Sequence, residues 1–566
     1  MNRTILLLTT LTLLYSPLFA VGKIYWQPNG ILITDRDGMV GLSPVPDGKG
    51  GVIVFASDGM DSIFAIKVDK NGNLPWTLHG KVLDDNGFGG FQGGPKSVSD
   101  GKGGAIAVWD RWYPWGHNLY YNRIDSLGNK AWAGNGVPLT LSDSTQEYHQ
   151  VVSDGAGGAI AAWQEQRNGQ WDIYAQRVDS NGLRQWGDYG KVVCNASNNQ
   201  DVPLVCSDDS GGVVVSWGDW RGANEDVYAQ RVKSDGNISW TSNGINLCNE
   251  IGNQGSGVPF SDGFGTIIFG WVDSRNGFSD IYAQRCNNEG NPLWIINGLP
   301  VCSEDSNQVQ LKAISDLQKG GVFVWTDGRS GSFGHWNVFT QRIDSMGNTL
   351  WQTGGIPVSN YDSAQWYPRM VGDNSSGAII SWRDKRNGNY DIYAQHVDSS
   401  GNVKWQTNGI AVCTTSYDQQ NPEMAPSDSN TAIIIWNDAR SGYWRGYAQR
   451  VGDDLNGIEE MQNEKSPIAN CKLNQNYPNP FKQSTMINYQ LTQAGRVSLK
   501  IYNVAGQLVR VLTPPNPPLE GRDKREVSVV WDGRDDKGHR VGKGIYFCQL
   551  QVDGKLTKTK KMLKIK

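Results

Sequence analysis

The sequence has little of what marks most metalloenzymes and nucleic-acid-binding proteins. Its 566 residues include only six histidines, and no two of them have the His-Glu-x-x-His spacing of a zinc site. Lysine and arginine number 52 against 56 aspartates and glutamates, so no basic excess points to nucleic acid or to an anionic membrane. No glycine-rich phosphate loop and no nucleophile-elbow pattern occurs. We therefore expect no metal, no cofactor and no nucleic-acid partner, and no motif identifies catalytic residues.

Long hydrophobic runs are also missing, except for one at the N-terminus. Ile5 to Leu14 are almost wholly apolar, follow Arg3 and precede a short segment that ends in Ala20. One positive charge, a short apolar core and a small residue at the end are typical of a secretory signal peptide. The run is too short for a membrane span of about 20 residues. We predict a signal peptide over residues 1–20 and no transmembrane segment in the mature chain.

Glycine and tryptophan, by contrast, are abundant at 69 and 23 residues, which favours short strands and tight turns. A glycine-rich turn followed by a short apolar run that ends in tryptophan recurs at steps of 54 or 57 residues. A weaker first copy ends at Ala56, which makes eight copies. The seven tryptophans are Trp109, Trp163, Trp217, Trp271, Trp325, Trp382 and Trp436.

Each repeat contains three further short segments. One alternates apolar and polar residues, as in Asp280 to Arg285, which is the period of a strand. Another runs from a tryptophan to an Asn-Gly turn, as in Trp405 to Val412, and a fourth precedes the next glycine-rich turn. Four strands in about 54 residues, repeated, are typical of a β-propeller blade. A β-solenoid is the alternative, although its repeats are usually shorter.

The two ends of the repeat region are out of phase. The last repeat reaches Val451 without its Trp…Asn-Gly strand, whereas Trp26 to Ile33 form such a strand with no repeat in front of it. An incomplete blade would leave an open sheet edge. We therefore predict an all-β fold over residues 21–452, an eight-bladed β-propeller closed by its N-terminal strand.

A polar linker, residues 453–472, leads to a C-terminal region of alternating strands and Gly/Asp turns over residues 473–566, which predicts a small Ig-like β-sandwich. This region resembles the C-terminal sorting domain of the type IX secretion system. The resemblance rests on motifs in matching order, with Lys482-Gln483 in place of the usual Asn-Pro: Tyr477–Phe481, Leu499–Gln507, Trp531–Gly538, Gly544–Tyr546 and Lys561–Leu563. The repeats are similar to those of other exported proteins with such a tail, which implies no particular activity.

The sorting-domain resemblance implies the route and the destination of the protein. The general secretion machinery would carry it to the periplasm, and the type IX machinery would carry it across the outer membrane. The mature protein would then be secreted or attached to the cell surface.

An acid and an arginine two residues apart follow most of the repeat tryptophans, as in Asp273-Ser-Arg275. Such a pair can bind an anion or a sugar, but repetition in six copies favours a structural ion pair.

Four cysteines share one repeat position, at the end of the Asn-Gly strand, and resemble small apolar strand residues. Two local disulfides are conceivable, Cys194 with Cys206 and Cys471 with Cys548.

Six tryptophans outside the repeat framework lie between its first two strands, where every blade has its connection on one face, and Tyr113, Phe278, Tyr390 and Tyr443 lie there too. Such rings can stack on sugars or form a protein-binding patch, or they can cover the repeated arginines. We predict that the protein is a binding or adhesion module for a glycan or protein, or alternatively a carbohydrate-active enzyme with its site in the central funnel. The candidate ligand-binding residues are Trp112, Trp115, Trp171, Trp220, Trp336, Tyr390 and Trp444.

Overall fold

The computed structural model describes residues 22–565, apart from 61, 86–93, 114–115, 133, 331–334, 429, 454–471, 491–496, 504–507, 513–525 and 553–554. The chain divides into two compact units, residues 1–453 and 454–566. All regular structure within the described residues is β-strand, as predicted. The predicted signal peptide lies outside the described residues.

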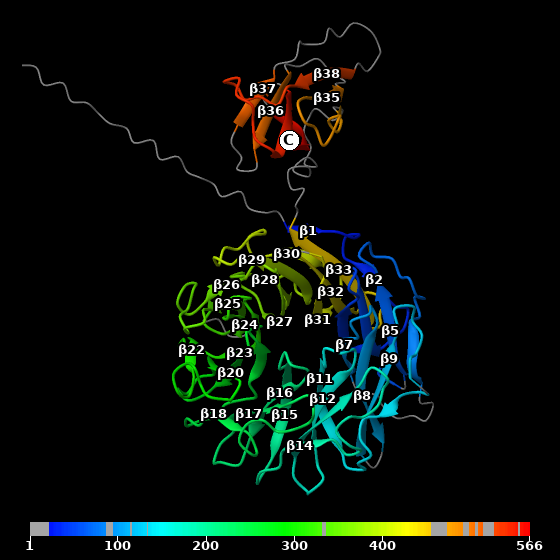
Figure 1. Cartoon of the computed structure of the whole chain (residues 1–566), viewed down its shortest axis with the longest axis vertical. Coiled ribbons are helices and arrows are strands. Elements are labelled where there is room, and N and C mark those ends of the chain that lie inside the picture. The colour runs from blue at the N-terminus through cyan, green and yellow to red at the C-terminus, as the bar shows by residue number, and fades with distance from the viewer. Residues whose placement is uncertain are drawn as a thin grey trace, which may run out of the picture. The chain divides into compact units, whose positions relative to one another are not determined.

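The first unit is a ring of antiparallel sheets, each built from strands that follow one another in the chain (Figure 1). We number the sheets in chain order. Sheet 1 consists of β3 (Val40–Pro46), β4 (Val52–Ser57), β5 (Ser62–Val68) and β6 (Lys81–Asp85), and sheet 2 of β7 (Lys96–Ser99), β8 (Ala105–Tyr113), β9 (Gly116–Ile124) and β10 (Val137–Pro138). Sheet 3 consists of β11 (Gln146–Ser153), β12 (Ala159–Glu165), β13 (Asp172–Val178) and β14 (Lys191–Cys194). Sheet 4 consists of β15 (Gln200–Ser207), β16 (Val213–Asp219), β17 (Asp226–Val232) and β18 (Ile245–Cys248).

The next three sheets repeat this order of four strands. Sheet 5 consists of β19 (Val258–Ser261), β20 (Ile267–Asp273), β21 (Asp280–Cys286) and β22 (Leu299–Cys302). Sheet 6 consists of β23 (Gln308–Ser315), β24 (Gly321–Asp327), β25 (Asn337–Ile343) and β26 (Ile356–Pro357). Sheet 7 consists of β27 (Gln365–Gly372), β28 (Ala378–Asp384), β29 (Asp391–Val397) and β30 (Ile410–Cys413). The first strand of each sheet contacts the first strand of the next. These strands therefore surround the centre of the ring, which is the arrangement of a β-propeller.

Sheet 8 combines the two ends of the repeat region. Its strands are β31 (Gln419–Pro426), β32 (Thr431–Asp438) and β33 (Arg445–Asp453), together with β1 (Gly22–Ile24) and β2 (Ile31–Leu32) from the N-terminus. Ile24 pairs with Val451, and the indole of Trp26 donates a 3.2 Å hydrogen bond to the Lys70 carbonyl of sheet 1. Since β31 also contacts β3, the N-terminal strand completes the last sheet and the ring is closed, as the phase of the repeats predicts.

The apolar core of the ring lies between neighbouring sheets. All seven repeat tryptophans are fully buried, and Trp325 of sheet 6, for example, belongs to one cluster with Ile281 of sheet 5. In each of these sheets the Asn-Gly turn, or its equivalent, lies over the ring of that sheet's repeat tryptophan, as Gly298 does over Trp271 in sheet 5. A Cβ on Gly298 would be 2.6 Å from Cζ2 of Trp271, and its φ of +80° favours glycine, so this turn accommodates no larger residue.

A bulge recurs near the start of the innermost strand. Its second residue has a positive φ in five sheets, at Tyr148, Val202, Gln310, Tyr367 and Asn421. For Val202, at +49°, this conformation is strained, because a β-branched side chain rarely adopts it. The bulge interrupts the ladder and re-aims the side chains at this end of the strand. The N–H of Tyr367 consequently donates a 2.8 Å hydrogen bond to Gln310 of the preceding sheet.

The second unit is a two-sheet β-sandwich. One sheet holds β34 (Lys472–Leu473), β35 (Thr485–Gln490) and β38 (Glu526–Trp531), and the other holds β36 (Val497–Asn503), β37 (Leu508–Leu512), β39 (Gly544–Val552) and β40 (Lys555–Lys564). Its core includes the fully buried Trp531, whose ring meets that of Phe481 at 5.4 Å between centroids. The architecture agrees with the predicted Ig-like β-sandwich.

Candidate functional site

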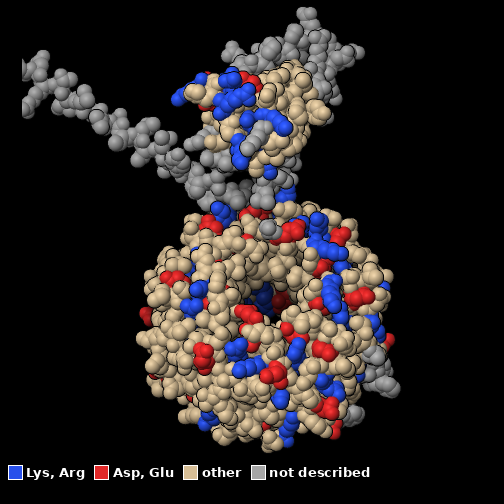
Figure 2. Space-filling model, viewed as in Figure 1, with Lys and Arg blue, Asp and Glu red and all other residues tan. Residues whose placement is uncertain are grey.

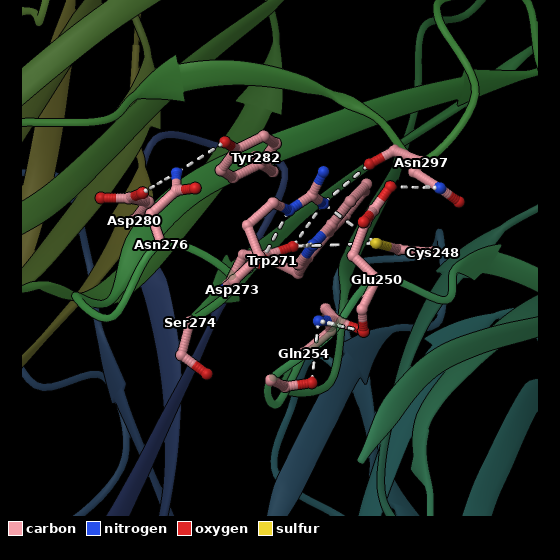
Figure 3. Close-up of polar contacts among 12 residues, drawn as sticks. Cys248, Glu250, Gln254, Trp271, Asp273, Ser274, Asn276, Asp280, Tyr282 and Asn297 are labelled. Atoms are coloured by element: carbon pink, nitrogen blue, oxygen red, sulfur yellow. Dashed lines mark hydrogen bonds and ion pairs between the residues drawn. The ribbon is translucent and has the colours of Figure 1, made fainter. Parts of the chain in front are cut away.

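The repeated acid and arginine form a structural joint between neighbouring sheets (Figure 3). The indole of Trp271 donates a 2.8 Å hydrogen bond to Asp273, which is fully buried, and the Arg275 guanidinium binds both oxygens of the same carboxylate at 2.9 and 2.5 Å. Arg275 also lies 3.0 Å from the Cys248 sulfur of sheet 4. Asp273 and the Nε and Nη2 of Arg275 are therefore already bound within the protein, which favours a structural role for the pair over an anion or sugar site.

Aromatic rings of the framework, tyrosines in six sheets and Phe339 in sheet 6, cover these arginines. The Arg275 guanidinium lies 3.9 Å from the Tyr282 ring, and Arg221 lies 4.0 Å from Tyr228. Equivalent contacts occur at Arg111, Arg167, Arg329, Arg386 and Arg440. The loop aromatics are therefore not needed to cover the repeated arginines, because the third strand of the sheet supplies a stacking ring in all seven of these contacts.

The shared cysteine position is part of the same joint. Cys194, Cys248, Cys302 and Cys413 are buried free thiols, and burial raises the pKa of Cys248 to about 12. The suggested disulfides are wrong, because Cys194, Cys206 and Cys548 are all free thiols; Cys471 itself lies outside the described residues.

The described residues among the predicted aromatics lie at or next to the connections between the second and third strands, with Trp112 near the end of β8 itself; we call this face of the ring the loop face. Trp112, Trp171, Trp220 and Trp444 belong to sheets 2, 3, 4 and 8, and Trp115 lies outside the described residues. The Trp112 ring stacks on the His117 ring, with 4.5 Å between their centroids. The side chain of Trp444 is 36% exposed. These four rings are thus distributed around the face. Only Trp336 and Tyr390 belong to a common site.

That site is an open pocket of about 490 Å³ on the loop face, between sheets 6 and 7. Its walls include the rings of Trp366 and Tyr390. Trp336 packs against Trp366, with 4.8 Å between ring centroids and an angle of 39°, and does not itself line the pocket. The volume suits a small ligand, and aromatic walls favour stacking on a flat or ring-shaped one. The remaining lining residues are His335, Asp362, Ser363, Ala364, Lys385, Arg386 and Gly388.

An arginine continues the aromatic array from this pocket toward the centre of the ring. The Arg383 guanidinium lies between two rings, 4.4 Å from Tyr390 and 4.3 Å from Tyr367. Tyr367 is the bulge residue of the innermost strand, so the array spans from a loop to the ring's inner edge. Within the described residues, the buried Nε of Arg383 has no hydrogen-bond partner. The guanidinium is therefore held by stacking and by a 3.4 Å hydrogen bond from Nη1 to the Gln420 side-chain oxygen, and not by a carboxylate.

Charged groups of both signs line the pocket. The Lys385 ammonium is exposed and lies 5.5 Å from the Tyr390 ring, and Asp362 forms an ion pair with His335. Arg386 and Ser363 are already bound to the buried Asp384. Lys385, which is exposed, and Asp362, whose side chain is 77% exposed despite its contact with His335, are therefore the groups best placed to bind the hydroxyls of a ligand stacked between Trp366 and Tyr390.

A second feature on the loop face is a pair of carboxylates in sheet 4. A Cβ on Gly218 would collide with Oε1 of Glu225 and lie 3.1 Å from Oδ1 of Asp201, so both acids lie over this glycine. Six of the other sheets carry a side chain at the equivalent position, after their tryptophan: Asp110, Gln164, Val272, Thr326, Arg383 and Asn437. The glycine therefore provides the space in which two acids meet.

These two carboxyls have perturbed titration behaviour. Burial, with a contribution from the nearby Asp201, raises the pKa of Glu225 to about 7. Burial also raises the pKa of Asp201, although a hydrogen bond with Trp220 opposes the change. A carboxyl group whose pKa lies near 7, with a second carboxyl beside it, is the kind of pair from which glycoside hydrolysis draws its general acid.

No metal site accompanies either feature within the described part of the chain. No group of three or more His, Cys, Asp or Glu side chains there is arranged to hold a metal ion. No helix among these residues is long and apolar enough to cross a membrane.

Residues 476–555 match the family model of the FlgD Ig-like domain. The C-terminal unit is therefore Ig-like. No curated protein matches the chain in sequence.

Solved structures are similar to the chain at low identity. A puromycin hydrolase is 14% identical with a TM-score of 0.38, over 73% of this chain and 62% of its own, so the chain spans less than two thirds of that protein. The polysaccharide lyase Uly1 is 8% identical with a TM-score of 0.41, over 62% and 88%. An α-L-arabinanase from Penicillium chrysogenum, complexed with arabinobiose, is 12% identical with a TM-score of 0.32, over 56% and 96%.

The sequence prediction found part of the pocket and missed the rest. Trp336 and Tyr390 were predicted, whereas Trp366, Arg383 and Lys385 were not. Trp366 lies in the innermost strand β27, where the equivalent residues of other sheets are Glu147, Asp201, Val309 and Gln420. A tryptophan at a position that is otherwise polar or aliphatic was the available signal.

Proposed function

We propose that this protein is an exported eight-bladed β-propeller that binds a glycan on its loop face, in the pocket between Trp366 and Tyr390. The observation that carries the proposal is an aromatic pair facing a 490 Å³ pocket with Lys385 and Asp362 at its rim. A sugar presents apolar C–H faces to aromatic rings and hydroxyls to charged groups, so this combination suits a sugar better than a purely apolar ligand.

A glycan array with single substitutions tests the proposal. Trp366→Ala and Tyr390→Ala each remove one wall of the pocket and should weaken binding roughly tenfold, about 1–2 kcal/mol. Trp336→Ala should have a smaller effect, because this ring supports Trp366 without lining the pocket. Trp171→Ala is the matched control, since this half-buried tryptophan lies on the same face in sheet 3. Unchanged binding by both Trp366→Ala and Tyr390→Ala would refute the site.

The carboxylates over Gly218 support a second candidate function, hydrolysis of a glycosidic bond. Glu225, the acid with the raised pKa, would protonate the leaving oxygen, and Asp201 would act as the ionised partner. Glu225→Gln and Asp201→Asn should then abolish release of reducing ends from a bound polysaccharide, while Trp366→Ala would mainly weaken its binding. If the wild type releases no reducing ends from any glycan that it binds, this candidate fails and the binding function stands.

For the C-terminal unit we propose a role in export. Its Ig-like fold and the motifs quoted for residues 473–566 support a type IX sorting domain, with delivery to the cell surface or the medium. Localisation of the chain with and without residues 473–566 tests this role. The truncated protein should accumulate in the periplasm, and its appearance outside the cell would contradict the proposal.

A further inference from the structure

One repeat position of the innermost strands faces the centre of the ring. Its eight residues each pair, across the sheet, with the residue before the repeat tryptophan or, in sheet 1, before Ala56; they are Ser43, Lys96, Gln150, Leu204, Val258, Lys312, Arg369 and Glu423. Because the sheets are equivalent, these residues share one level of the central channel. Figure 2 shows that the centre of the ring is hollow, with charged side chains inside the opening.

Three of the eight side chains are cations and one is an anion. Arg369 of sheet 7 binds Glu423 of sheet 8 at 2.8 Å, so this pair is neutral overall. Lys96 and Lys312 are exposed to the channel, and neither forms an ion pair with another described residue. The level therefore carries two positive charges that have no ion-pair partner among the residues that the structure describes.

The two lysines and the ion pair act on one another. Although Lys312 is accessible to water in the channel, the surrounding protein reduces its hydration, and this desolvation together with the charge of Arg369 lowers the pKa of Lys312 to about 8; Glu423 opposes this change and Lys96 adds to it. Lys96 and Lys312 belong to sheets 2 and 6, on opposite sides of the ring, and the charge of Lys96 acts on Lys312 across the channel. Like charges held together without a counter-ion destabilise the free protein, and an anion between them would relieve the repulsion.

We propose that the central channel binds an oxyanion, held by Lys312, Lys96 and Arg369. The ligand is a free sulfate or phosphate ion, or the acidic group of a glycan that reaches into the channel. This site is separate from the pocket at Trp366 and does not depend on the function proposed for that pocket. Glu423 limits its affinity, because its carboxylate competes with the ligand for Arg369.

Isothermal titration calorimetry of the full chain at pH 7 and low ionic strength tests the proposal, with sodium sulfate and a galacturonate oligosaccharide as separate probes. Lys312→Met should weaken binding at least tenfold, and Glu423→Gln should tighten it severalfold. Lys102→Met is the matched control, because Lys102 is exposed in the turn between β7 and β8, away from the innermost strands' charged level. If sulfate binds, a free oxyanion is a sufficient ligand for the channel. If the oligosaccharide binds and sulfate does not, the ligand is the acidic group of a glycan.

Thermal unfolding separates loss of the site from loss of the fold. Lys312→Met should unfold at or above the wild-type midpoint, because it removes a repelled charge, and sulfate should raise the midpoint of the wild type alone. Binding should also weaken from pH 7 to pH 9 as Lys312 loses its proton, with proton uptake on binding near pH 8. Binding of neither probe, or equal binding by wild type and Lys312→Met, would overturn the proposal. Trp366→Ala should leave sulfate binding unchanged.

Discussion

Nδ1 of His396 lies 2.8 Å from Oδ1 of Asp453, so this imidazole joins sheet 7 to the last strand of sheet 8. Its other nitrogen lies 2.9 Å from Asp373 of its own sheet. Arginines hold this position in other sheets; Arg177, for example, binds Asp154 of its own sheet and the Ser234 carbonyl of the next. The ring is thus closed at one joint by a titratable group.

This histidine should make the stability of the ring depend on pH. Hydrogen bonds with the two carboxylates outweigh the effect of burial and raise the pKa of His396 to about 9. A raised pKa means that the contribution is complete below the unfolded value of about 6.5 and is lost as pH rises through about 9. The free energy of unfolding should therefore fall by about 3 kcal/mol between pH 6.5 and pH 10.

Chemical denaturation at several pH values measures this effect. His396→Arg is the control, because arginine occupies the same position in other sheets and stays charged. In this variant the contacts with Asp373 and Asp453 should contribute no fall in the free energy of unfolding over this pH range. A wild type and a His396→Arg variant with the same pH profile would contradict the assignment.

Removal of the N-terminal strands should destabilise the whole ring. Without residues 22–34, β33 loses its pairing with β1 and β2, and sheet 8 presents an open edge. We expect a lower and broader thermal transition than that of a chain lacking only residues 1–21. Identical transitions for the two truncations would show that the strand does not close the ring.

The buried acid of the repeated joint should contribute to stability and not to ligand binding. Asp273→Ala would leave the Arg275 guanidinium and the Trp271 indole without their acceptor, at a cost of about 3–5 kcal/mol. Urea denaturation measures the loss, and a glycan array of the folded variant should match that of the wild type. A stable variant with altered glycan binding would reverse this assignment.

Glu225→Gln should stabilise the protein above neutral pH. Since burial raises the pKa of Glu225 to about 7, the ionised form is unfavourable in the folded state, and the wild type loses stability as pH rises through 7. The variant lacks this loss and should be more stable by about 1 kcal/mol at pH 8.5, after allowance for its partial exposure. Glu289→Gln, in an exposed turn of sheet 5, is the control and should show no such gain.

The sequence by itself determined the repeating sheets, because each strand and turn is specified locally. The glycine-rich turn, the apolar run and the Asn-Gly turn recur with one period, so local conformation and hydrophobic pattern agree in every copy. The out-of-phase ends likewise indicated closure by the N-terminal strand. The Ig-like unit followed from alternating strands in the same way.

Only the tertiary structure decided which side chains meet. Trp336 and Trp366 come from different sheets, and their rings touch because neighbouring sheets pack face to face. Lys96 and Lys312 are further apart in the chain, and only closure of the ring brings their charges to one channel. The repeat period shows that such positions are equivalent, but the distances between them depend on how the sheets pack around the centre, which no local pattern specifies.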